Sequence, residues 1–161
     1  MKVDLKNATI TLKDGGSESL EIKVGEGNIT FTEHLARKYE LDKGLLDTVR
    51  DDDQAPVDVS LEFSWEWIKS AGGDPPTPVE ALKKIGAASG WVSSSSDQCE
   101  PYCLDVEILN NADCDDGTEN ELILLPDFRY EELAYDLSAG QIAVSGKCNV
   151  TDAVVTRVPQ S

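Results

Sequence analysis

The stretch that decides the fold class is Val57-Asp58-Val59-Ser60-Leu61-Glu62-Phe63-Ser64-Trp65-Glu66-Trp67-Ile68. From Val57 to Trp67 every second residue is apolar, and acids and serines fill the positions between. This two-residue period is typical of a β-strand with one buried face and one face exposed to water. The sequence therefore predicts a long strand from Val57 to Ile68. Its polar face either meets bulk solvent or lines an aqueous channel.

Shorter alternating segments precede this strand. The alternation from Val3 to Lys13 slips in phase near Asn7, which predicts a strand with an irregularity. The turn residues Asp14-Gly15-Gly16 follow, and apolar residues alternate again in 20–24 and 29–31. We therefore expect an antiparallel meander of three strands in the first 33 residues.

Downstream, one helix interrupts the strands. Thr77-Pro78-Val79-Glu80 combines an N-cap residue, a first-turn proline and a capping-box glutamate, which predicts a short helix ending near Ile85. Further strands are expected at 104–108, 122–130, 141–147 and 150–158, with an acidic loop at 110–120. The predicted fold is mainly β, a single domain over residues 1–161.

The segment between His34 and Ala55 lacks regular alternation, and we expect it to be a long loop between strands. Loops of more than about 12–15 residues are uncommon and usually functional. Leu45, Leu46 and Val49 are costly to leave in water, so either this domain or a partner should cover them. A solvated loop with a short helical turn is the alternative.

Charge limits the classes of partner. The chain has 161 residues and a formal net charge of -17, while its 40% hydrophobic and 28% charged content is that of an ordinary globular protein. This charge disfavours binding to nucleic acid or to anionic membranes. The amino-terminal residues lack the apolar run of a signal peptide, so we expect synthesis and folding in the cytosol.

Four cysteines lie in the last two fifths of the chain: Cys99, Cys103, Cys114 and Cys148. Three states stay open for them. They can be reduced thiols in the cell, they can form at least one disulfide after release to an oxidising medium, or they can bind zinc, although the paired C-x-x-C spacing is missing.

Motifs for catalysis or cofactor binding are not found in the sequence. His34 is the single histidine and is interpreted as a surface residue. The run 113–121 resembles a calcium loop but places glycine and threonine where an EF-hand requires Asp or Asn and then glycine. We therefore expect a protein that is not an enzyme and has no cofactor.

Six segments carry a resemblance to a known family: Asn7–Gly15, Gly25–Asn28, Arg37–Arg50, Phe63–Trp67, Pro126–Glu131 and Ser145–Asn149. In their order along the chain they resemble tail tube proteins of long-tailed bacteriophages. The resemblance implies a β-sandwich or barrel with a flanking helix. It also implies hexameric rings that stack into a tube, through which DNA passes into the host without specific binding.

The resemblance also implies partners and roles for residues. The partners would be further copies of the chain, a tape-measure protein, and tail terminator and baseplate proteins, within a virion assembled in the bacterial cytoplasm. Asp58, Glu62, Glu66 and Glu21, together with Thr30 and Thr32, would face the lumen, where acids repel DNA phosphates. Leu45, Leu46, Val49 and Arg50 would contact the neighbouring subunit or the next ring. Alternatives are a capsid or virion decoration protein, and a tube subunit of a contractile injection or type VI-like system.

Overall fold

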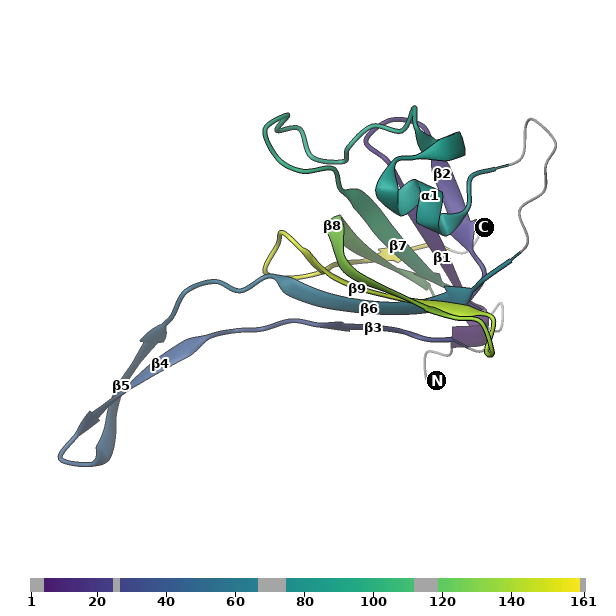
Figure 1. Ribbon diagram of the computed structural model, residues 1–161. Coiled ribbons are helices and arrows are strands. Elements are labelled where there is room, and N and C mark those ends of the chain that lie inside the picture. The colour runs from purple at the N-terminus through teal and green to yellow at the C-terminus, as the bar shows by residue number, and fades with distance from the viewer. Residues whose placement is uncertain (1–4, 25–26, 67–74, 112–118, 160–161) are drawn as a thin grey trace.

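The computed structural model describes residues 5–24, 27–66, 75–111 and 119–159. Within these residues, eight strands form one antiparallel sheet and two more form a separate hairpin (Figure 1). The sheet order is β2-β1-β7-β8-β9-β6-β3, and β10 also pairs with β8. The bounds are β1 Ala8–Lys13, β2 Ser19–Ile22, β3 Ile29–Thr32, β4 Arg37–Asp42, β5 Leu45–Asp51, β6 Val57–Ser64, β7 Leu104–Asn110, β8 Asn120–Asp136, β9 Gln141–Cys148 and β10 Val154–Val158. The predicted mainly β fold is confirmed.

The core lies between the two halves of this curled sheet. On β6 the apolar residues are buried as their spacing predicts, and Phe63 is fully inaccessible. The core cluster also takes side chains from β1, β2, β7, β8, β9 and the helix. Near its open end the sheet almost closes, because the Ser64 N–H donates to the Lys23 carbonyl at 3.0 Å. The result is a barrel-like sandwich.

Helix α1, Pro78–Lys83, covers one end of this core. Its capping box forms as predicted: the Thr77 hydroxyl accepts from the Glu80 N–H at 3.3 Å, and the Glu80 carboxylate accepts from the Thr77 N–H at 3.2 Å. Backbone N–H donors from Ala87 and Thr77 lower the pKa of Glu80. The helix buries Ala81 and Leu82. Among the described residues, no helix combines the length and hydrophobicity needed to cross a membrane.

The predicted three-stranded meander is wrong in its third strand. β1 and β2 form the expected hairpin, but β3 pairs with β6. Gly27 explains this arrangement, because a Cβ atom there would lie 2.5 Å from the Glu62 carbonyl oxygen. The missing side chain lets the chain approach β6 closely, where the Glu62 N–H donates to the Asn28 carbonyl at 2.8 Å.

Strand lengths differ from prediction in two places. β6 ends at Ser64, so the prediction of a strand is wrong for Trp65 and Glu66, and Trp65 is 42% exposed although its spacing predicted a buried position. The predicted positions Trp67 and Ile68 lie outside the described residues. β8 continues past the predicted end at Tyr130 to Asp136, because a register shift between Tyr130 and Glu132 allows pairing with β9 to go on. The phase slip near Asn7 is a turn of 3-10 helix, Leu5–Asn7, ahead of β1.

Candidate assembly interface

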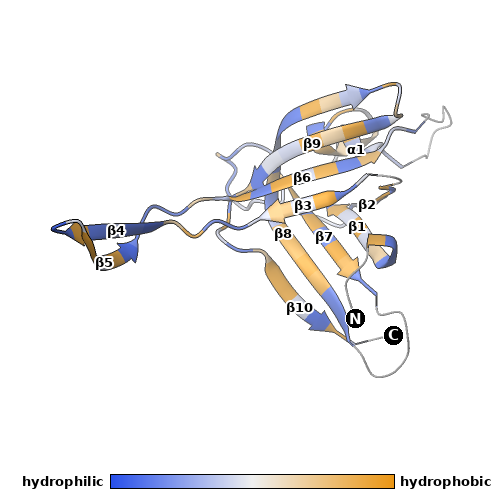
Figure 2. Cartoon of the chain, turned by 90° about the horizontal axis from the view of Figure 1, so that it is seen from below, coloured by the Kyte–Doolittle hydropathy of each residue, from blue (hydrophilic) through white to orange (hydrophobic). Residues whose placement is uncertain are grey.

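The predicted long loop is a projecting β-hairpin. β4 and β5 pair from Arg37↔Asp51 to Asp42↔Leu45, with a register shift between Glu40 and Leu41. Lys43 and Gly44 close the turn with φ values of 53° and 80°, as a two-residue hairpin turn requires. Every residue of both strands is exposed, and the hairpin extends well away from the sheet (Figures 1 and 2). The interpretation of this segment as a loop is therefore corrected.

The hairpin has one apolar face. Tyr39 pairs with Val49 and Leu41 pairs with Leu46, so the register places all four side chains on one side. They are 56–77% exposed, and Leu35 at the base of the hairpin is 70% exposed. Hydrophobic side chains so near one another are rarely left in water on a monomeric protein. A lone two-stranded hairpin is also marginally stable. This face is therefore a candidate contact surface.

The opposite face of the hairpin is polar. Arg50 forms an ion pair with Glu40 at 3.1 Å, and the Thr48 hydroxyl donates to the same carboxylate at 3.1 Å. Leu45 lies on this side too, opposite Asp42 beside the turn. Of the four residues predicted to contact a neighbour, the structure therefore brings Leu46 and Val49 together and places Arg50 and Leu45 on the other face.

A second surface is the outer face of β3, β6, β9 and β8. Asp58 and Glu62 project from β6 between its buried residues. Around Asp58 lies a polar groove of about 470 Å³, lined by Thr30, Thr32, Asp58, Val59, Ser60, Glu131, Glu132, Ser145, Gly146 and Lys147. Acids outnumber bases here, because Lys147 is the one base beside three acids in this lining. Glu131 and Glu132 belong to the extension of β8 that the sequence did not predict.

The predicted lumen residues occupy different settings. Asp58 accepts a hydrogen bond from His34 Nε2 at 2.6 Å and lies 3.9 Å from the Lys147 ammonium. Glu66 lies just beyond the end of β6 and pairs with Lys23 at 3.6 Å. Glu21 is on β2, at the other end of the sheet order, and it is not among the residues that line the groove around Asp58.

The same four strands leave two edges unpaired within the described residues. β3 pairs with β6 alone. The second half of β8, residues 129–136, pairs with β9 on one side, while β7 stops opposite Phe128. Unpaired edges offer backbone donors and acceptors to another strand. The sheet can therefore be extended on both sides.

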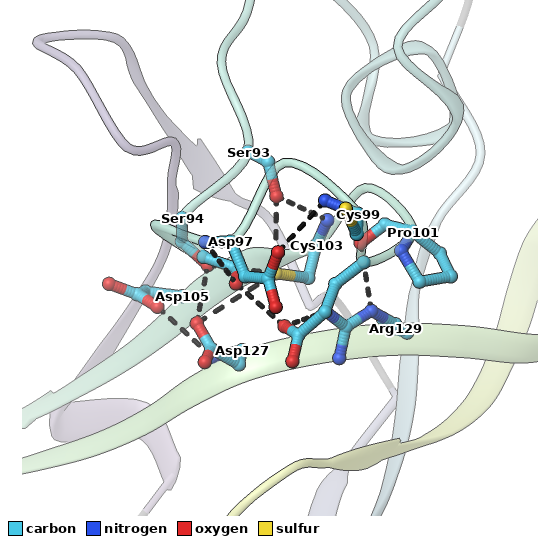
Figure 3. A network of polar contacts seen from close by, with 11 residues as sticks. Ser93, Ser94, Asp97, Cys99, Pro101, Cys103, Asp105, Asp127 and Arg129 are labelled. Carbon is cyan, nitrogen blue, oxygen red and sulfur yellow. Dashed lines mark hydrogen bonds and ion pairs between the residues drawn. The ribbon is translucent and has the colours of Figure 1, made fainter.

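A partly buried polar network anchors the loop 93–103 to the junction of β7 and β8 (Figure 3). The Ser94 hydroxyl donates to Asp127 at 2.9 Å, and Arg129 holds the loop through the Pro101 carbonyl at 2.9 Å and Glu100 at 3.1 Å. The Cys103 thiol lies within the network, 3.2 Å from the Ser94 hydroxyl. These contacts give the network a structural role.

Three cysteines are free thiols in the structure: Cys99 is exposed, while Cys103 and Cys148 are buried. Burial raises the pKa of Cys148 to about 12, so this thiol stays protonated. Cys114 and most of the acidic loop lie outside the described residues. Within the part of the chain that the structure describes, no group of three or more His, Cys, Asp and Glu side chains is arranged to hold a metal ion.

The pKa of Asp105 in this network predicts that the stability of the fold depends on pH. Burial raises its pKa, and the Asp127 and Glu107 carboxylates add to the effect, against the hydrogen bond from the Asp127 N–H. Because the folded-state pKa is raised, Asp105 destabilises the fold increasingly as pH rises from its unfolded pKa through its folded pKa. Asp105→Asn keeps the acceptor oxygen and removes the charge. We expect it to raise the Tm by a few degrees at pH 7 and not at pH 3, measured by circular dichroism. An equal shift at both pH values would contradict this.

This chain is similar to known proteins in its structure and not detectably in its sequence. No known protein-family model matches the chain, and no curated protein matches it significantly in sequence. The fold is similar to a chain in the cryo-EM structure of the sheath/tube terminator of an extracellular contractile injection system, PVC, in the extended state. The TM-score is 0.54 at 10% identity, covering 97% of both chains.

A second similar chain comes from the PVC sheath-tube complex in the extended state. Here the TM-score is 0.56 at 9% identity, covering 98% of this chain and 93% of the other. Both similarities establish a shared fold. Since nearly the whole of each chain is covered, the similar chains have about the same length as this one.

Proposed function

We propose that this protein is the tube subunit of a long-tailed bacteriophage tail, forming stacked hexameric rings around a channel for DNA. The observation that carries the proposal is the exposed apolar face of the β4–β5 hairpin, because such a face favours a partner and the described residues of this chain leave it uncovered. The shared fold with chains of a sheath-tube complex supports the same role.

The two open sheet edges support ring formation. β8, β9, β6 and β3 are antiparallel in turn, so β3 and β8 run in opposite directions. The β3 edge of one subunit would therefore meet the β8 edge of the next as an antiparallel pair. Six subunits contributing four strands each, at about 4.8 Å per strand, would give a circumference of about 115 Å and a diameter of about 37 Å, which tilted strands would widen. Such a ring leaves neither of these two edges exposed.

In this ring the outer face of β3, β6, β9 and β8 would line the lumen. Asp58, Glu62 and Glu132 would then face the channel, and the positive charge of Lys147 would offset part of their negative charge. An acidic wall repels phosphates, so DNA would move along it without adhering. Glu21 lies on another part of the sheet and is not part of this wall in our proposal.

The first experiment is negative-stain electron microscopy of the purified protein at low and high salt. We expect sixfold rings or stacked tubes, and more of them at high salt, because screening weakens the repulsion between subunits of charge -17. A protein that stays monomeric at both salt concentrations, alone and together with its genomic neighbours, would contradict the proposal.

The lumen assignment predicts a gain of DNA binding on charge reversal. Tubes of the double variant Glu62→Lys, Glu132→Lys are expected to retain duplex DNA at low salt and release it at high salt, because each added lysine neutralises a phosphate. The control is Glu62→Gln, Glu132→Gln, which removes the acids without adding bases. Retention is measured by co-sedimentation of tubes with labelled DNA. If lysine tubes bound no more DNA than glutamine tubes, the lumen assignment would be wrong.

A second candidate is the tube subunit of a contractile injection system, which the similarity to the two PVC chains favours. The assembly would be the same and the transported molecule would differ. Particles isolated from the natural source separate the two, because packaged DNA supports the phage tail, whereas a contractile sheath around a tube that holds protein supports the injection system.

A further inference from the structure

An exposed aromatic patch lies at the end of the sheet opposite the hairpin. The distal patch consists of Trp65, Tyr135 and Leu137, which are 42%, 49% and 82% exposed. The Trp65 and Tyr135 rings lie 5.4 Å apart between centroids at 53°. The backbone N–H of Trp65 donates to the Gly140 carbonyl at 2.7 Å, which brings the β8–β9 turn against Trp65. Leu137 follows Tyr135 by two residues and lies in the turn that Trp65 contacts, so the three exposed side chains lie at the same end of the sheet.

Hydrogen bonds hold this patch in a defined shape. The Asp136 carboxylate accepts from the Ser138 hydroxyl at 2.8 Å and from the Ser138 and Ala139 N–H groups at 3.1 Å and 3.2 Å. The hydrogen bond from the Ser138 hydroxyl, followed by the one from the Ala139 N–H, lowers the pKa of Asp136, so it is charged at neutral pH. Leu137 sits in this fixed turn with its side chain in water. A preorganised apolar surface loses little entropy on binding.

The patch and the hairpin stand at opposite ends of the same strands. β6 starts where the hairpin returns to the sheet and ends immediately before Trp65, so about 26 Å of strand separates them (Figure 1). Two different surfaces at opposite ends of one subunit can form a head-to-tail contact, which repeats without limit along an axis. This is the geometry that stacking requires.

Charge also favours contact between these two surfaces. The four bases of the hairpin, Arg37–Asp51, cancel its four acids, so the -17 of the chain lies elsewhere. The hairpin can therefore approach another copy with less repulsion than any acidic face. Lys38 and Lys43 have no ion pair among the described residues, and acidic Asp136 lies at the edge of the distal patch.

We propose that the apolar face of the hairpin docks on the distal patch of a second copy of this chain, in the next ring. The inference rests on the proposed function and names the receiving surface. Tyr39, Leu41, Leu46 and Val49 would pack on Trp65, Tyr135 and Leu137, and Lys43 at the hairpin tip would approach Asp136. Aromatic residues at the centre of such a contact commonly supply much of its binding energy.

Disulfide trapping between two differently tagged copies tests the contact. In a Cys99→Ser background, one copy carries Leu46→Cys and the other Leu137→Cys, and tubes of the mixture are oxidised. We expect a mixed dimer at least tenfold above the level for Leu46→Cys mixed with Val92→Cys. Val92 is a matched control, since it is apolar and 55% exposed but lies against the β1–β2 turn, where its carbonyl accepts from the Gly15 N–H at 2.8 Å.

The outcomes separate the inference from the proposed function. Tubes that form the disulfide between positions 46 and 137, and not the one between positions 46 and 92, support both the docking surface and the tube function. Tubes in which the 46–137 link is absent, or no stronger than the control, overturn the docking surface and leave the tube function standing. A protein that never self-associates overturns both.

A second variant tests the same contact without cysteines. Leu137→Lys puts a charge into the distal patch and leaves the ring-forming edges of β3 and β8 intact. We expect single rings and at least a tenfold loss of stacked tubes by electron microscopy, with an unchanged circular dichroism spectrum. Normal tubes from this folded variant would overturn the proposal.

Discussion

Gly146→Ala is expected to destabilise the fold by about 3 kcal/mol or more, which lowers the Tm by about 6–12 °C. Gly146 lies in β9 between Val59 of β6 and Tyr130 of β8. A Cβ atom there would lie 2.1 Å from the Arg129 carbonyl oxygen and 2.8 Å from the Tyr130 Cα. Both are backbone atoms of the strand where the register shifts, so a side chain cannot turn aside to relieve the clash.

The control for this variant is Gly90→Ala. A Cβ atom at Gly90 meets nothing within 4 Å, so the free energy of unfolding should change by about 0.5 kcal/mol at most and the Tm by about 2 °C at most. Thermal unfolding followed by circular dichroism measures both variants. Equal Tm shifts for Gly146→Ala and Gly90→Ala would contradict the close backbone approach of β8 and β9 at Gly146.

Leu46→Asp is expected to abolish stacked tubes while the monomer stays folded. Leu46 is 77% exposed and pairs with Leu41 across a hairpin that lies away from the core, so the Tm of the monomer should not change. In the assembly, the substitution would lose about 1.5–3 kcal/mol of apolar burial at each contact and would place an unpaired carboxylate there. Because the contact recurs for every subunit of a ring, no tubes should be visible by electron microscopy.

Val92→Asp provides the matched control for Leu46→Asp. It also replaces an exposed apolar side chain by Asp, but at a position outside the hairpin, and tubes should form normally. Circular dichroism on both variants establishes that the monomers fold. If Leu46→Asp gave tubes of normal length, the hairpin would not be the inter-subunit element, whatever the fate of Val92→Asp.

Local patterns predicted the local structure well. Alternation from Val57 onward located the central strand and its buried face, and the Thr77 to Glu80 motif located the helix and its cap. In both cases the signal comes from neighbours in sequence, through side-chain direction in a strand or hydrogen bonds within one helical turn. The general mainly β character followed from the same kind of evidence.

The hairpin was missed because the two-residue pattern reports a strand with one buried face. β4 and β5 are exposed on both faces, and the register shift after Glu40 interrupts the alternation. The turn at Lys43-Gly44 was the signal that could have located it. From the sequence, either this domain or a partner is expected to cover these hydrophobic residues. The described part of this domain leaves Leu46 and Val49 exposed, so their cover by a partner stays a prediction.

The sequence by itself determined that this chain forms amphipathic strands and one capped helix, and that a strongly acidic surface covers an ordinary core. Beyond the β1–β2 hairpin, tertiary structure alone decided which strands become neighbours. The pairing of β3 with β6 and the extension of β8 to Asp136 involve close backbone approaches at Gly27 and Gly146, between residues distant in sequence. Such contacts are set by packing of the whole sheet, and a local pattern carries no information about them.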